Sequence, residues 1–451
     1  MKAIDLRRTL LVLALQPLVV AGIGCATDEG DVDDDYVRED VGKGDSATST
    51  DPNRLIDVPF YFSVPKTASA LPINRSAYPY PTIWNGSVQA SDVGLRVIAI
   101  QQGTTLESKK QARRDMAAKL AAAGVLQAGD LVLSFRPELA GTMAYPHIQM
   151  GVTHAGLVYT ENGKAYNLDS PLDTVYNGQF DSAHYAGDGA MDQGANALHI
   201  MRPRGMTDSR RAQFRSWVGT LKQNLSRING QRAQIKFQSD YLTPAWVSAG
   251  KTPRQTVTTL GKIILELDTS TKQPMYCSEL AWHMLALSSC TPQEIRDAGP
   301  DGASCVDDVF APMPLVAKDA TEVGLADGPL MVLQAMPEPI RLANVAKIFT
   351  TGDAAKLSSG HRAVSEMVAP LMAPLEQFYM GKLSGMATPE MLEAGATQLS
   401  AQMPANYSPT AFIVQAIAPE SLRAVDYVST LAFVGQTAYE KAKRLSSNPV
   451  P

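Results

Sequence analysis

The chain has 451 residues, enough for two or three domains with a sizeable hydrophobic core. Its composition is ordinary, with 45% hydrophobic and 19% charged residues, which excludes a wholly disordered, collagen-like or polytopic membrane protein. The formal net charge of -5 gives no basic footprint, so no nucleic-acid partner is expected. Four cysteines are too few for a small protein built on a disulfide framework, so each is considered individually.

The first 25 residues have the three parts of an export signal. Basic residues precede the apolar run Thr9–Val20, which is too short to span a bilayer comfortably, and small residues lead from there to Cys25. A small residue directly before a cysteine resembles the lipobox of bacterial lipoproteins, which implies lipidation of Cys25 after cleavage. An ordinary secretory signal with an incidental Cys25 is the alternative.

Residues 26–54 form an acidic segment that is poor in apolar residues. Nine Asp and Glu residues lie between positions 26 and 45, against Arg38 and Lys43. Such a segment cannot bury enough apolar surface to fold, so we expect a disordered, extended linker. Together with a lipidated Cys25, it predicts a periplasm-facing protein tethered to a membrane of the cell envelope. By analogy with bacterial lipoproteins, the lack of Asp directly after Cys25 favours the outer membrane.

Globular sequence is expected from residue 55 onward. Aromatic and β-branched residues predict a strand over 58–64, and helix formers predict a helix over 108–123. Asn162-Gly163 indicates a hairpin between two of four further short strands, which are expected over 131–135, 154–159, 165–169 and 197–201. A helix capped by Thr207 is expected over 208–226, and a buried helix over 275–287.

From about residue 339 the pattern becomes helical. Apolar residues recur at helical spacing over 364–383, 391–399 and 422–445, with Pro and Gly between these runs. We therefore expect an α+β domain over residues 55–320, followed by a helical C-terminal region over residues 339–451.

Cys277 stands at the expected start of the buried helix, three residues after Pro274. The exposed N–H groups and the positive end of a helix dipole stabilise a thiolate there, and the same N–H groups could hold an oxyanion. These are the needs of a nucleophilic cysteine. A buried structural cysteine is the alternative.

A nucleophilic cysteine also needs an imidazole base and a group that orients the base. The six histidines are at positions 147, 154, 184, 199, 283 and 361. His154 begins a strand and is followed by Ala155-Gly156, where small residues allow close approach. His199 and His283 lie in apolar segments and are interpreted as structural. A structural role for His154 is the alternative to a catalytic one.

Three motifs follow one another along the chain: GDLVL at 129–133, THAGLV at 153–158 and YCSEL at 276–280. This ordered set resembles the circularly permuted papain-like cysteine hydrolases of the NlpC/P60 superfamily, in particular the YiiX/YebB-like group, over about residues 126–287. In permuted members the histidine strand precedes the cysteine helix, as here. The resemblance implies a permuted papain-like α+β fold, here with a C-terminal helical extension.

The resemblance also implies roles for residues. Cys277 takes the place of the nucleophile and His154 that of the base. Asp169 is expected to orient His154, and Asn167 on the same strand face is the fallback. A capping role for Asp169 before Pro171 is the alternative. Tyr276 is interpreted either as lining the oxyanion site or as a packed aromatic residue.

These roles imply amide hydrolysis through a thioester, with a cell-wall peptide as a candidate substrate. Two alternatives stay open: a lipid esterase or acyltransferase that uses the same site, and a non-catalytic envelope binding lipoprotein. No cofactor is expected. The sequence has no zinc-like spacing of His and Cys, no phosphate-binding loop and no serine nucleophile elbow.

Cys290 and Cys305 lie fifteen residues apart in a polar stretch. In an oxidising compartment they could close a disulfide worth about 3 kcal/mol. Two free cysteines are the alternative.

Overall fold

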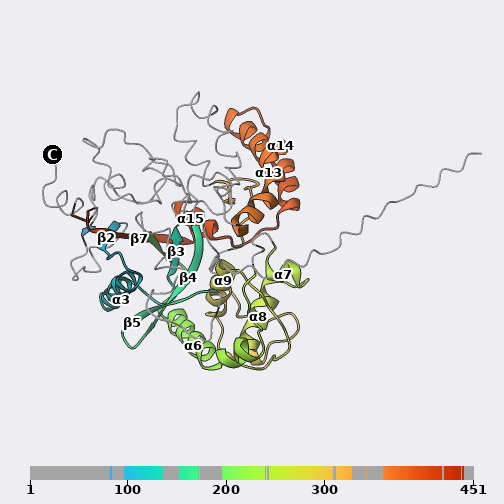
Figure 1. Ribbon diagram of the computed structural model, residues 1–451. Coiled ribbons are helices and arrows are strands. Elements are labelled where there is room, and N and C mark those ends of the chain that lie inside the picture. The colour runs from blue at the N-terminus through green and yellow to red at the C-terminus, as the bar shows by residue number, and fades with distance from the viewer. Residues whose placement is uncertain are drawn as a thin grey trace, which may run out of the picture.

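Figure 1 shows the computed structural model of the chain, in which helices pack around one central sheet. The structure describes residues 82–83, 96–135, 152–170, 172, 196–238, 240, 243–307, 311–327, 342, 359–418, 421–437 and 439–440. The predicted signal, Cys25, the linker and the strand expected over 58–64 lie outside these residues, as do His147 and His184.

Seven strands form the sheet, in the order β1-β2-β7-β6-β3-β4-β5. The five strands from β7 to β5 pair antiparallel, whereas β1, β2 and β7 run parallel. With helices packed on this largely antiparallel sheet, the predicted α+β class is confirmed. The strands are β1 (Thr82–Ile83), β2 (Arg96–Gln101), β3 (Leu131–Phe135), β4 (Val152–Glu161), β5 (Lys164–Leu168), β6 (Asn196–Pro203) and β7 (Val425–Val434).

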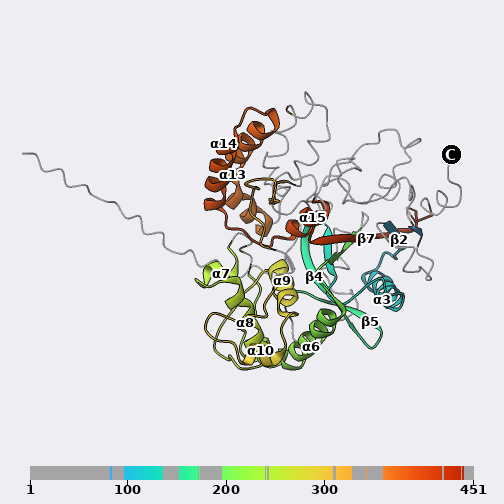
Figure 2. The ribbon, with the colours of Figure 1, turned by 180° about the vertical axis from the view of Figure 1, so that it is seen from behind.

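The two faces of the sheet are buried by different helices. Along β3, Leu131 and Leu133 belong to a large hydrophobic cluster with α6, α8, α9 and α15, whereas Val132 belongs to a smaller cluster with α3. Figure 2 shows α3 on one side of the sheet and α6, α8 and α9 on the other. The helices are α3 (Leu106–Ala122), α6 (Asp208–Leu225), α7 (Ala245–Ser248), α8 (Pro253–Ile264), α9 (Cys277–Leu287), α10 (Pro292–Arg296), α13 (Ser359–Ser384), α14 (Pro389–Gln402) and α15 (Pro409–Ile417), and a π-helical turn spans Ser226–Gln231.

Several local predictions are confirmed by these elements. The helix expected over 208–226 is α6, and the Thr207 side chain accepts a hydrogen bond from the backbone N–H of Arg210. The hairpin between β4 and β5 turns at Asn162 and Gly163, whose φ angles are 52° and 74°. Positive φ at both central residues is the geometry that favours Asn-Gly in a tight hairpin.

The helix predicted over 422–445 is wrong for Val425–Val434, which form strand β7. Residues 425, 427, 429, 431 and 433 of this strand are all buried, so burial follows a period of two. β7 inserts between β2 and β6 and pairs with both. The C-terminal region therefore supplies a central strand to the sheet as well as the helices α13, α14 and α15.

A buried ion-pair network fixes the start of β3. Asp130 is 0% exposed and accepts two hydrogen bonds from Arg202, at 2.9 Å from Nε and 2.7 Å from Nη2. Arg211 lies 3.5 Å from the same carboxylate. Gly129 precedes it with a φ of 86°, and an added Cβ would come within 2.3 Å of Met206. Both residues of the Gly-Asp pair in the first motif therefore have a structural role. Gly129 allows the positive φ and the close approach of Met206, and Asp130 binds the arginine side chains.

The C-terminal region also contacts the residue next to Cys277. Tyr276 is fully buried, and its hydroxyl oxygen accepts a hydrogen bond of 3.3 Å from the Tyr407 backbone N–H. The Tyr407 ring stacks on Trp282 of α9 with a centroid distance of 3.9 Å. Tyr276 is therefore a packed aromatic residue.

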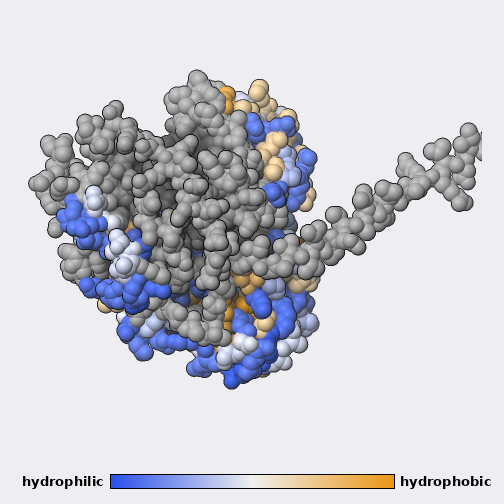
Figure 3. Space-filling view, in the orientation of Figure 1, coloured by the Kyte–Doolittle hydropathy of each residue, from blue (hydrophilic) through white to orange (hydrophobic). Residues whose placement is uncertain are grey.

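In Figure 3 the described surface over α3 and α6 is mainly hydrophilic, in keeping with helices that bury their other side.

Candidate active site

Cys277 is the first residue of α9. The preceding Tyr276 has extended backbone angles, φ -79° and ψ 169°, and its side chain does not cap the helix. The first-turn N–H groups of a helix have no carbonyl partner within it, and the positive end of the helix dipole lies there. The predicted position of Cys277 at a helix start is therefore confirmed. The residue is 1% exposed.

The β4–β5 hairpin brings His154 and Asp169 together. In the hairpin register Leu157 pairs with Leu168, so the next residue, Asp169, lies opposite Gly156. Gly156 is two residues after His154, and residues two apart in a strand share a face of the sheet. His154 and Asp169 therefore lie on the same face. Gly156 has no side chain to separate the two. His154 Nε2 lies 3.2 Å from Asp169 Oδ2, with side-chain exposures of 4% and 14%.

The same imidazole interacts with Cys277. α9 packs against β4, which carries His154. Burial alone would lower the pKa of His154, but hydrogen bonds to Asp169 and Cys277, together with their negative charge, raise it to about 9. The three residues that the sequence singled out thus lie together, and the imidazole interacts with both the carboxylate and the thiol.

Asn167 supports this arrangement through Asp169. Its Nδ2 donates a hydrogen bond of 3.0 Å to Asp169 Oδ2, the oxygen that also contacts His154. The sequence predicts Asp169 as the orienting residue, with Asn167 as the fallback. The structure brings both to the site, with Asp169 against the ring and Asn167 against the carboxylate.

Two other histidines are placed as structural residues. His199 is fully buried in β6, and burial lowers its pKa to about 3. His283 is fully buried in α9, where burial lowers its pKa to about 4 and Nδ1 lies 2.8 Å from the Glu279 carbonyl oxygen. Both rings are therefore neutral at pH 7, as expected of packed imidazoles. His361 lies within α13.

Sequence reasoning missed the importance of Glu279, the third residue of α9. Its carboxylate is fully buried, and burial raises its pKa to about 8. It accepts hydrogen bonds from backbone N–H groups of Ala245 and Tyr276. A Glu at the third helical position that reaches back to the N-cap N–H is half of a capping box, and that spacing was the available signal.

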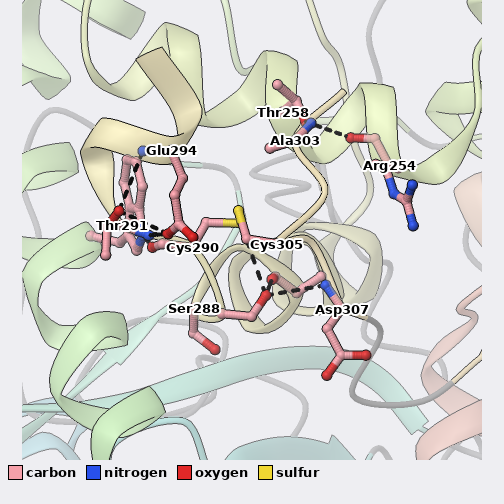
Figure 4. Close-up of a disulfide and its surroundings, with 12 residues drawn as sticks. Arg254, Thr258, Ser288, Cys290, Thr291, Glu294, Ala303, Cys305 and Asp307 are labelled. Atoms are coloured by element: carbon pink, nitrogen blue, oxygen red, sulfur yellow. Dashed lines mark hydrogen bonds between the residues drawn. A yellow bond between two sulfur atoms is a disulfide. The ribbon is translucent and has the colours of Figure 1, made fainter. Parts of the chain in front are cut away.

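The pair Cys290–Cys305 is a disulfide with a Cα–Cα distance of 5.2 Å, drawn in Figure 4. Cys290 follows α9 closely, and its carbonyl oxygen accepts a hydrogen bond of 2.8 Å from Trp217 Nε1 of α6. The bond therefore ties the far end of the Cys277 helix to the loop around Cys305. The predicted disulfide is confirmed.

Reduction of this disulfide should lower the free energy of unfolding by about 3 kcal/mol, because the closed loop spans fifteen residues. Chemical denaturation with and without reductant measures the difference. The variant Cys290→Ser/Cys305→Ser should show the same loss and no further response to reductant. Equal stability of the oxidised and reduced chains would contradict this expectation.

Among the described residues, no cluster of three or more His, Cys, Asp or Glu side chains could hold a metal ion. In the same part of the chain, no helix is both long and apolar enough to cross a membrane. Comparison with known proteins found no matching family model, no matching curated protein and no matching solved structure.

The interaction between Asp169 and His154 predicts how the imidazole titrates. In Asp169→Asn the carboxylate charge is lost, so the His154 pKa should fall from about 9. A raised histidine pKa stabilises the fold fully below about pH 6.5 and loses that effect as pH rises through about 9. The stabilisation that comes from protonated His154 should therefore disappear at a lower pH in the variant than in the wild type.

Titration of the His154 ring by NMR, with denaturation across the same pH range, checks both expectations. Asn167→Ala is the matched control, because it removes an uncharged neighbour of the same carboxylate and should move the His154 pKa less. An unchanged His154 pKa in Asp169→Asn would show that the carboxylate does not hold the imidazolium.

Proposed function

We propose that this chain is an envelope-anchored cysteine hydrolase with a permuted papain-like fold, and that it cleaves amide bonds. The observation that carries the proposal is the His154 ring, which interacts both with Asp169 and with Cys277 at a helix start. Nucleophilic cysteines need this combination of thiol, base and orienting group. A peptide of the cell wall is the substrate class that the sequence resemblance favours.

The mechanism follows from the placement of the three side chains. His154 holds the thiol proton as an imidazolium, and the Cys277 sulfur attacks the substrate carbonyl carbon. N–H groups in the first turn of α9 stabilise the resulting oxyanion. His154 then gives its proton to the departing amine, which leaves an acyl thioester on Cys277. Water, deprotonated by His154, hydrolyses the thioester and releases the carboxylic acid.

Burial of the thiol adds one requirement. Cys277 is 1% exposed, so neighbouring groups have to move before a substrate carbonyl reaches the sulfur. Such closed sites exclude water from the reacting groups and strengthen the electrostatic interactions within them.

The proposed location rests on two features. A lipidated Cys25 and the acidic linker would hold the domain at the periplasmic side of a membrane, and the Cys290–Cys305 disulfide suits an oxidising compartment. Globomycin treatment of expressing cells tests the anchor, because it blocks lipoprotein signal cleavage. Accumulation of the uncleaved chain supports lipidation, whereas normal cleavage contradicts it.

The activity is tested with muropeptides and phospholipids supplied to the purified full chain and to Cys277→Ser. We expect new amino groups from muropeptides and an acyl group on Cys277 by mass spectrometry, both absent in the variant. Release of fatty acid would instead assign ester hydrolysis or acyl transfer to the site. Binding without turnover or acylation would identify a non-catalytic envelope protein.

A further inference from the structure

Glu279 is a buried carboxylate held entirely by neutral donors among its described contacts. Oε1 accepts a hydrogen bond of 2.6 Å from the backbone N–H of Ala245, and Oε2 accepts one of 3.4 Å from Gln238 Nε2. The backbone N–H of Tyr276 is a third donor. A carboxyl group at 0% exposure is costly unless its oxygens are satisfied, and these donors partly offset the burial that raises its pKa to about 8.

The three donors belong to three different stretches of chain. Ala245 begins α7, and Tyr276 is the residue directly before Cys277. Gln238 ends a stretch that runs parallel to the approach to α9, with its backbone N–H bonded to the Met275 carbonyl oxygen at 3.2 Å. The Glu279 side chain therefore connects the first turn of the Cys277 helix to two other segments, one at Gln238 and one at Ala245.

This first turn carries the N–H groups on which the proposed reaction depends. An oxyanion is stabilised only by donors about 2.7–3.1 Å from its final position, and a displacement of about 1 Å costs about a hundredfold in rate. We propose that Glu279 is a positioning residue, which fixes the first turn of α9 against residues 238 and 245 and so holds the oxyanion donors in place. The inference rests on the proposed hydrolase function, although its structural part is independent of it.

Glu279→Gln tests the proposal in kinetics above pH 8, where Glu279 is ionised and both of its oxygens accept hydrogen bonds. Glutamine keeps the size of the side chain but has one acceptor oxygen instead of two. It cannot serve all three donors. We expect kcat to fall about 10- to 100-fold with KM within about threefold of wild type. Amide hydrogen exchange should become faster in peptides that contain Ala245 and Tyr276.

Asp327→Asn is the matched control. Asp327 is also a buried carboxylate that accepts a backbone hydrogen bond of 2.6 Å, from Gly324, but it packs against Tyr379 and Lys382 of α13. Its loss should destabilise the chain without changing kcat by more than about twofold. This separates a positioning effect from a general loss of stability.

Wild-type kcat in Glu279→Gln, or the same fall in kcat in both variants, would overturn the proposal. Unchanged exchange around Ala245 and Tyr276 would overturn it as well. If the wild type shows no turnover, the hydrolase function fails, and faster exchange in Glu279→Gln then supports the positioning role alone.

Discussion

His154→Ala is expected to lower kcat by about a thousandfold or more. In the proposed mechanism the substitution removes both the acceptor of the thiol proton and the donor to the leaving group, and positioned acid–base groups contribute about 10²–10⁴-fold. It also removes the imidazole that interacts with Cys277 and that the proposed mechanism pairs with the thiolate. Single-turnover kinetics on the muropeptide substrate should place the loss in the acylation step, with KM much less affected.

His199→Asn is the control for this expectation. His199 is also a fully buried imidazole, on β6, which β3 separates from β4, but its ring lies beside Tyr427, with a centroid distance of 6.4 Å. Its replacement should reduce stability and leave kcat within a few-fold of wild type. If His154→Ala and His199→Asn reduce kcat equally, His154 has only a structural role.

The largest effect on stability is expected from Asp130→Ala. The change leaves two arginine side chains, Arg202 and Arg211, without the buried carboxylate that they contact. Breaking a buried ion pair by removing one partner costs about 3–5 kcal/mol. Chemical denaturation of the full chain should show this decrease in the free energy of unfolding.

Glu107→Ala is the comparison for an exposed pair. Glu107 is bound to Arg114 at 2.9 Å, but its side chain is 74% exposed, so its loss should cost less than about 1 kcal/mol. If Asp130→Ala costs no more than Glu107→Ala, the Asp130 network is not a determinant of the fold.

Local signals made much of the fold predictable. Asn162-Gly163 fixed the hairpin because this pair adopts positive φ readily, and Thr207 marked the start of α6 because its hydroxyl accepts a first-turn N–H. The position of Cys277 was also a local property, set by Pro274 and the apolar run that follows. Such features depend on a few adjacent residues.

Features that depend on distant partners were not predictable in this way. The run Val425–Val434 is apolar at both helical and strand spacing, and its choice of strand depends on pairing with β2 and β6, more than 200 residues away in the sequence. At the site, Asp169 was ranked ahead of Asn167 only through the family resemblance, because both lie on one strand face and only the hairpin register shows which one contacts His154. Glu279 went unnoticed because its donors Ala245 and Gln238 come from separate stretches.

The proposed mechanism requires Cys277 and His154 to form a thiolate–imidazolium pair. In full-length Cys25→Ser with the disulfide intact, Cys277 is the sole remaining thiol, so ultraviolet thiolate absorbance reports it alone, without needing access for a reagent. We predict thiolate absorbance at pH 7 that is largely lost when His154→Ala is added. Absence of the signal at pH 7, or an equal signal with and without His154, would show that the two side chains do not form this pair.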